Sequence, residues 1–158
     1  MSSDKKQPPI IRKSTARLAA VQALYSYDLN KGAQSADEMT IDLVSHYNDQ
    51  QGAENELVLP DKKFLARLVD KTSSETLVVD GIIIEFLAEN WTIDKLGSVI
   101  KSILRCAVTE LKYMPEIPSK VVINEYTTLT RSFYGDKEIG FVNGILEKIA
   151  LKIRPEEF

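Results

Sequence analysis

Cysteine, histidine and glycine are scarce in this 158-residue sequence, and their scarcity argues against several kinds of site. Cys106 is the only cysteine and His46 the only histidine, so the chain offers neither an internal disulfide nor the ligand spacing of a zinc site. The seven glycines form neither a phosphate-binding loop nor a nucleophile elbow. We therefore expect a protein that is not an enzyme and that needs no metal or other cofactor.

Long apolar runs are also missing. None reaches the ~18 residues that a membrane span requires, and the first ten residues lack the apolar core of a secretory signal peptide. Hydrophobic residues make up 44% of the sequence and charged residues 27%, which is typical of a globular protein large enough to bury a core without disulfides. A single cysteine suits a reducing compartment. We expect a cytoplasmic, globular protein.

Positive charge is concentrated near the N-terminus. The net charge is −3, yet residues 5–27 contain five basic residues and no acidic one, whereas the rest of the chain carries 15 basic and 23 acidic residues. A basic arm on an acidic body indicates an anionic partner. The alternative is a solvated tail, and charge alone favours neither reading. The five basic residues are Lys5, Lys6, Arg12, Lys13 and Arg17.

Apolar residues repeat every three to four positions through most of the chain, which predicts an all-α protein. Residues 1–11 are expected to form a flexible arm because they contain two prolines and few apolar groups. A helix capped by Ser14 or Thr15 should then run to about Asn30. Its predicted apolar face consists of Leu18, Val21, Tyr25 and Leu29.

Further helices are predicted along the remaining sequence. A capping box at Ser35–Glu38 precedes a short one, and residues 48–60 read as a surface loop. Residues 77–84 are rich in β-branched side chains, but burial in a core outweighs that local preference for strand, so we predict helix there. Two more helices follow, one at 99–114 and one capped by Ser119, before the last at 141–149.

These elements predict a bundle of about seven helices. A single domain should span residues 12–152, with residues 153–158 as a tail. The loop at 48–60 divides the domain loosely into two helical halves. Cys106 is expected to be a small buried hydrophobic group, and Gly144 to permit close packing of two helices.

Three stretches resemble the NusB family of transcription antitermination factors. The first helix contains AVQALY at 20–25, the second stretch is ILRCAVTEL at 103–111, and the third is IPSKVVINEY at 117–126, followed by FVNGILEK at 141–148. The order and spacing of these motifs also agree, and the resemblance covers about residues 12–150. It supports helix where local propensity favours strand.

The resemblance implies an all-helical fold of two packed subdomains and a role in transcription. NusB-like proteins bind the boxA element of nascent ribosomal RNA transcripts together with NusE, which is also a protein of the small ribosomal subunit. The complex joins other Nus factors on RNA polymerase and suppresses premature termination. Members bind RNA partly through an arginine-rich N-terminal arm, which is diluted in this sequence. The resemblance leaves open whether the protein is a monomer or a homodimer.

Candidate binding residues combine the basic arm with rings on which unpaired bases can stack. Tyr27 and Phe133 are further stacking candidates, with the core as the alternative for every ring. Arg105, on an otherwise apolar helix, is assigned by resemblance to the RNA or NusE surface, and its alternative is an intramolecular ion pair. The RNA-binding candidates are Lys5, Lys6, Arg12, Lys13, Arg17, Tyr25, Arg105, Lys137 and Phe141. The partner-binding candidates are Gln22, Tyr25, Ile100 and Arg105.

A second function remains open beside RNA binding. The same fold could serve as a non-catalytic docking module for proteins, with weak or no affinity for RNA, because the basic arm is diluted. RNA affinity measured with and without NusE would separate the two functions.

Overall fold

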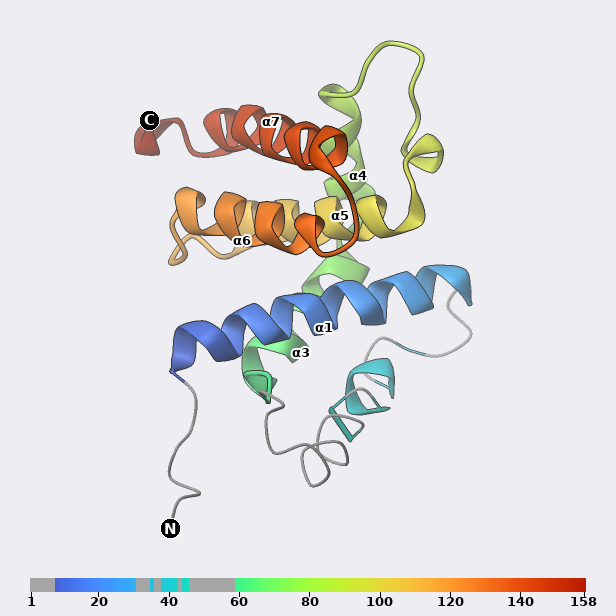
Figure 1. Cartoon of the computed structure of the whole chain (residues 1–158), viewed down its shortest axis with the longest axis vertical. Helices are drawn as coiled ribbons and strands as arrows, with labels where there is room; N and C mark the ends of the chain where they lie inside the picture. Colours follow the sequence, from blue (N-terminus) through green and yellow to red (C-terminus); the bar gives the residue numbers. More distant parts are fainter. Residues whose placement is uncertain (1–7, 31–34, 36–37, 43, 46–58) are drawn as a thin grey trace. The chain divides into compact units, whose positions relative to one another are not determined.

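The computed structural model describes residues 8–30, 35, 38–42, 44–45 and 59–158 (Figure 1). Every regular element among these residues is helical, as the sequence predicted. Helix also covers residues 38–42 and 44–45, behind the predicted capping box. No helix in the described ranges is long and apolar enough to cross a membrane. The named elements are α1 (Pro9–Leu29), α3 (Lys62–Ser74), α4 (Thr76–Glu85), η2 (Ile93–Lys95), α5 (Ser98–Tyr113), α6 (Ser119–Arg131), α7 (Asp136–Ile153) and η3 (Pro155–Glu157).

Local chemistry explains two of the helix starts. The capping box is formed as predicted: the Glu38 amide donates to Ser35 Oγ, and the Ser35 amide donates to Glu38 Oε1, each at 3.0 Å. Asp61 caps α3 by accepting the Phe64 amide at 3.0 Å. Both caps satisfy amide groups that the first turn of a helix leaves without intrahelical partners.

Helix α1 begins earlier than the predicted caps at Ser14 and Thr15. Pro9 occupies its first position, where a fixed φ angle suits a helix and the missing amide proton costs nothing. Residues 9–11, expected in the flexible arm, are therefore helical. Ser14 donates its hydroxyl proton to the Ile10 carbonyl at 3.1 Å instead of capping the helix. Residues 1–7 of the predicted arm, and nearly all of the predicted loop at 48–60, lie outside the described residues.

The predicted apolar face of α1 was partly wrong. Leu29 is exposed, with 57% of its surface accessible, because it lies at the last position of the helix. Most of the buried residues are small, which lets neighbouring groups approach the helix closely. They are Ala16, Arg17, Ala19, Ala20, Val21, Ala23 and Leu24.

The chain divides into two compact units, the first ending at Asp70 and the second spanning Lys71–Phe158. Helix α1 and the first part of α3 belong to the first unit. The Asp61 amide donates to the Arg12 carbonyl at 3.1 Å, which ties the start of α3 to α1. Phe64, Leu65, Leu68 and Val69 bury the apolar stripe of α3.

Helix α5 is the central element of the second unit, since it contacts α4, α6 and α7. Its side chains Ile103, Leu104, Ala107 and Leu111 are almost completely buried. Each large apolar side chain buried in this way contributes roughly 1.5–3 kcal/mol. Helices α6 and α7 also pack on each other (Figure 1). Residues 77–84 are helical within α4, as predicted.

A buried polar cluster holds the C-terminal end of this unit. Arg154 is 4% exposed and donates hydrogen bonds to four carbonyl groups, those of Glu110, Leu111, Met114 and Ile117. The carbonyls of Glu110 and Met114 also accept backbone amides, from Met114 and Ile117, so Arg154 is their second donor. It also bonds the carbonyls of Leu111 and Ile117 at the end of α5 and in the following turn. Its Nη1 also lies 3.1 Å from Glu157 Oε2. We call Arg154, Glu157 and Ser119 the Arg154 cluster.

The Arg154 cluster corrects the predicted cap of α6. Ser119 is the first residue of that helix, Pro118 occupies the cap position, and no side chain caps the helix from there. Instead, the Ser119 amide donates to Glu157 Oε1 at 2.8 Å. This bond is the largest cause of a lowered pKa for Glu157, with further lowering by the Ser119 side chain and Arg154. A carboxylate far along the chain thus caps α6 in place of the serine that the sequence suggested.

Two smaller predictions have different outcomes. Cys106 is completely buried, as expected, and desolvation raises the pKa of its thiol strongly. The prediction for Gly144 was wrong, because a Cβ atom added there would meet nothing within 4 Å. The glycine therefore does not serve a close approach of helices.

Candidate functional site

The described cations of the N-terminal arm contact other groups of the first unit. Lys13 Nζ lies 3.6 Å from Asp61 Oδ2 and 5.8 Å from the centroid of the Phe64 ring. Partial burial acts to raise the pKa of Asp61, but the Phe64 amide, Lys13 and Arg12 lower it overall. Arg12 and Lys13 are both half-buried. Both keep exposed surface on the first half of α1, where an anionic chain could reach them.

Arg17 is situated differently from its neighbours. Its side chain is 2% exposed, and its guanidinium carbon lies 5.0 Å from the centroid of the Phe64 ring. Such a contact stabilises a cation over an aromatic face. Burial therefore argues against a direct contact between Arg17 and RNA. Lys5 and Lys6 lie outside the described residues, as does His46.

The candidate residues on the later turns of α1 are at least partly exposed to solvent. Gln22 is exposed, and Tyr25 and Tyr27 are half-buried. Neither tyrosine is a fully buried core residue. Their assignment to an RNA or protein surface remains a prediction.

Arg105 forms an ion pair between α5 and α4. Its Nε donates to Asp80 Oδ1 at 2.8 Å and its Nη2 to Asp80 Oδ2 at 2.7 Å. This two-pronged geometry is the strongest that arginine makes with a carboxylate. The alternative left open by the sequence, an intramolecular pair, is therefore present. A contact of Arg105 with RNA or NusE remains a prediction.

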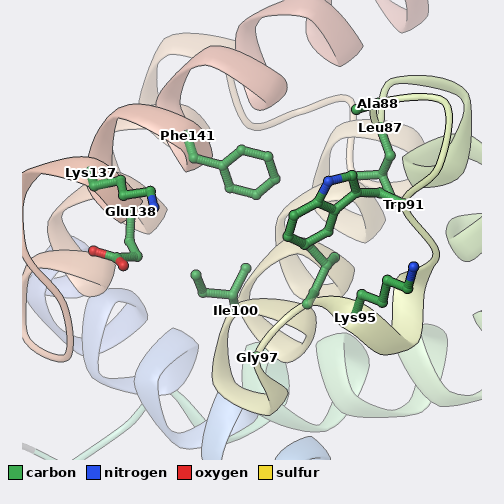
Figure 2. A pocket seen from close by; sticks show the side chains of 10 residues that line it. Leu87, Ala88, Trp91, Lys95, Gly97, Ile100, Lys137, Glu138 and Phe141 are labelled. Atoms are coloured by element: carbon green, nitrogen blue, oxygen red, sulfur yellow. The ribbon is translucent and has the colours of Figure 1, made fainter.

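Three candidate residues of the second unit, Ile100, Lys137 and Phe141, meet in one surface groove of about 430 Å³. Figure 2 shows the ring of Phe141 on one side of the hollow and the indole of Trp91 on the other. Ile100 lies between them and is nearly buried. The complete lining is Leu87, Ala88, Trp91, Lys95, Leu96, Gly97, Ile100, Lys137, Glu138 and Phe141. We call it the Trp91–Phe141 groove.

Half of the groove's lining was not predicted from the sequence. Trp91, Lys95 and Leu87 come from the segment between α4 and α5, which carries no helical repeat that would place them. A signal was present: Trp91 is the only tryptophan, and it lies in a polar connection, not in an apolar stripe. Phe133, another stacking candidate, is exposed but does not line the groove.

Lysines lie on both sides of the groove. Lys137 and Glu138 stand at the start of α7, and Lys95 on the opposite side (Figure 2). Lys95 Nζ donates to the Asn90 carbonyl at 3.2 Å, whereas Lys137 has no ion-pair partner within the described part of the chain. Among the described residues, no group of three or more histidine, cysteine or acidic side chains could hold a metal. The fold and the groove together define an all-helical protein with a surface groove lined by aromatic and basic side chains.

Comparisons with known proteins agree with this description. The NusB family model matches residues 14–151, nearly the whole chain. The transcription antitermination protein NusB of Caulobacter vibrioides is 35% identical over 154 residues, covering 98% of this chain and 99% of that protein. The NusB protein of Rickettsia bellii is 36% identical over 155 residues, covering 95% and 94%. The chain belongs to the NusB family.

Solved structures support the fold. A NusB structure from T. maritima has a TM-score of 0.77 at 24% identity and covers 97% of this chain and 98% of its own. A crystal structure of the antitermination factors NusB and NusE in complex with dsRNA has a TM-score of 0.72 at 26% identity. The match covers 89% of this chain and 97% of that one.

Proposed function

We propose that this chain is a transcription antitermination factor that binds boxA-like RNA of ribosomal RNA transcripts together with NusE. In complex with other Nus factors and RNA polymerase, it suppresses premature termination in the cytoplasm and catalyses no reaction. The observation that carries the proposal is the match to the solved complex of NusB and NusE with RNA, which extends over 97% of the matched chain. Curated relatives of the same length support the same role.

The chemistry of the chain suits an RNA ligand. Arg12 and Lys13 on α1 can neutralise phosphates and release the counterions condensed on them. Rings that keep exposed surface, such as Phe141 and Tyr25, can stack on unpaired bases, which is how proteins usually read single-stranded RNA. Affinity would thus come largely from phosphate contacts, and sequence preference from the rings.

Equilibrium titration of a boxA-type RNA with the full chain, with and without purified NusE, tests the proposal. We expect NusE to raise the RNA affinity, because the two proteins offer RNA a joint surface. Equal affinity with and without NusE would contradict a joint site.

The contribution of the arm is tested with variants that remove charge but keep a long polar side chain. The double variant Arg12→Gln/Lys13→Gln should weaken RNA binding and reduce the salt slope of log K by roughly 1.4, about 0.7 for each phosphate that is no longer neutralised. The matched control is Lys120→Gln/Lys148→Gln, which removes two exposed lysines of α6 and α7. If both variants bind RNA alike, the arm has no special role.

A second candidate function is a protein-docking module with weak affinity for RNA. One observation favours it: three of the predicted RNA cations, Lys13, Arg17 and Arg105, already contact groups of the chain itself. In that case the chain would still bind NusE, whereas boxA-type RNA alone would not bind to it even at low salt.

A further inference from the structure

We propose that Lys62 and Lys63, at the start of α3, form a second phosphate-contact surface for the bound RNA, beside the cations of α1. The inference rests on the proposed function and extends its RNA path from one helix of the first unit onto another. Neither lysine is among the binding residues that the sequence indicated. We call Arg12, Lys13, Lys62 and Lys63 the α1–α3 basic patch.

The starts of α1 and α3 lie against each other within the first unit (Figure 1). Asp61, the residue before α3, donates its amide proton to the Arg12 carbonyl at 3.1 Å. Lys62 and Lys63 follow directly, and both of their side chains are exposed. The two lysines therefore stand next to cations of α1 that the proposed function already assigns to RNA.

The surroundings of the patch are strongly positive, although the whole chain has a net charge of −3. Residues 8–17 and 59–69 contain six basic side chains and one acidic side chain, that of Asp61. Asp61 is already engaged, because it accepts the Phe64 amide at 3.0 Å and lies 3.6 Å from Lys13 Nζ. One carboxylate thus stands against six cations, which favours a polyanion as the ligand.

The fold gives no reason for lysines at these two positions. Within the described part of the chain, neither Lys62 nor Lys63 has an ion-pair partner. Both occupy the first turn of α3, where the positive end of the helix dipole disfavours cations, and that turn contains no acidic residue. Proteins depart from such local preferences mainly at functional sites. The two lysines therefore serve a ligand outside the chain.

An RNA strand suits the patch better than an acidic protein surface does. Each nucleotide of a strand brings one phosphate, so neighbouring cations on two adjoining helices can each neutralise one. Lys62 and Lys63 continue on α3 the contacts that Arg12 and Lys13 offer on α1. They also supply positive charge where the arginines of the N-terminal arm are diluted. The same strand can thus lie across both helices.

The double variant Lys62→Gln/Lys63→Gln tests the inference in the full chain. It should reduce the salt slope of log K for a boxA-type single-stranded RNA by roughly 1.4, about 0.7 for each phosphate that is no longer neutralised. If variant and wild type bind alike at 1 M salt, the variant should bind about 25-fold more weakly at 0.1 M. The anisotropy of labelled RNA across a salt series provides the measurement.

Two further variants separate the charge from its position. Lys62→Arg/Lys63→Arg keeps both charges and should keep the affinity and the salt slope of the wild type. The matched control is Lys120→Gln/Lys148→Gln, which removes two exposed lysines of the second unit, one of them in the first turn of α6. It should leave the salt slope unchanged.

Stability gives a readout that a structural role would move in the opposite direction. Because the two lysines oppose the dipole of α3, Lys62→Gln/Lys63→Gln should leave the urea midpoint of unfolding unchanged or slightly higher. RNA binding should therefore weaken in a chain that is no less stable, as followed by circular dichroism. A less stable variant that binds RNA as the wild type does would assign the lysines to the fold and overturn the inference.

Three binding results would also overturn it. Lys62→Gln/Lys63→Gln could match the wild type while Arg12→Gln/Lys13→Gln weakens RNA binding, which would reject the contact on α3 and leave the proposed function intact. The α3 variant could bind RNA normally but NusE, titrated without RNA, more weakly, which would make the patch a contact for a protein. Failure of the wild-type chain to bind RNA at low salt would reject both the patch and the RNA-binding function.

Discussion

Two regions of the second unit place their charged side chains in opposite surroundings, one buried and one exposed. In the Arg154 cluster, a buried guanidinium donates to four carbonyls and an ion pair with Glu157 closes the arrangement. In the Trp91–Phe141 groove, two large rings and a lysine are left exposed on the surface. The first region uses its polar groups to hold the fold, and the second leaves its groups open to a ligand. Stability and binding should therefore respond to different substitutions.

The largest expected effect comes from removing the Arg154 guanidinium. Arg154→Met should lower the free energy of unfolding by roughly 3–5 kcal/mol, because it leaves the buried carbonyls of Leu111 and Ile117 without the guanidinium donor and breaks the ion pair with Glu157. Urea unfolding followed by circular dichroism measures the change, with Lys148→Met as a control at an exposed site. RNA affinity at a temperature where the variant is folded should be unchanged. A decrease below about 1 kcal/mol would show that the carbonyls find other partners.

Tyr126 tests a second polar interaction inside the same unit. Its hydroxyl donates to Glu110 Oε2, and both residues are completely buried between α6 and α5. Tyr126→Phe keeps the ring and removes the donor, so we expect the free energy of unfolding to fall by about 1–3 kcal/mol. Thermal and urea unfolding provide the measurement. An unchanged stability would mean that the hydrogen bond contributes nothing net.

The side chains of Arg105 and Asp80 are more exposed than Arg154 and less exposed than the two rings of the groove. Arg105→Gln and Asp80→Asn should each cost about 1–2 kcal/mol of unfolding free energy, because each breaks the same largely buried pair. Binding separates the two possible roles of the guanidinium. If Arg105→Gln weakens RNA or NusE binding and Asp80→Asn does not, Arg105 contributes directly to the interface, as the family resemblance implies.

The smallest expected effect concerns pH. Hydrogen bonds from Ser119 and Arg154 lower the pKa of Glu157 below the usual value for a glutamate. Stabilisation by this carboxylate is thus fully present above the pKa of the unfolded state and is lost as pH falls through the lower pKa of the folded state. The melting temperatures of wild type and Glu157→Gln should differ by a constant amount near neutral pH and converge as pH falls through the lowered pKa of Glu157 in the folded state. A difference that persists at about pH 2 would contradict this assignment.

The sequence predicted most of the fold because apolar periodicity and prolines are local signals. The apolar repeat at 99–114 predicted α5, and the helix predicted from Ser119 onward is α6. The helix predicted at 141–149 lies within α7, which begins five residues earlier, at Asp136. Helix at 77–84 was predicted against local propensity, and the resemblance supported it.

Features that depend on distant residues could not be predicted in this way. The amide that donates to Glu157 lies 38 positions earlier, so the sequence suggested the nearer Ser119 side chain as a cap. Asp80 and Arg105 are 25 positions apart and meet only because α4 packs on α5. Ile100, Lys137 and Phe141 were named as separate candidates from the sequence, but only the folded chain places Trp91 and Lys95 beside them.

The affinity of the full chain for a boxA-type single-stranded RNA, measured across a series of salt concentrations, tests the central claim most directly. The account predicts tight binding at low salt and a linear fall of log K with the logarithm of salt concentration, at about 0.7 per phosphate contacted. Absence of binding at low salt, or an affinity that does not depend on salt, would contradict it.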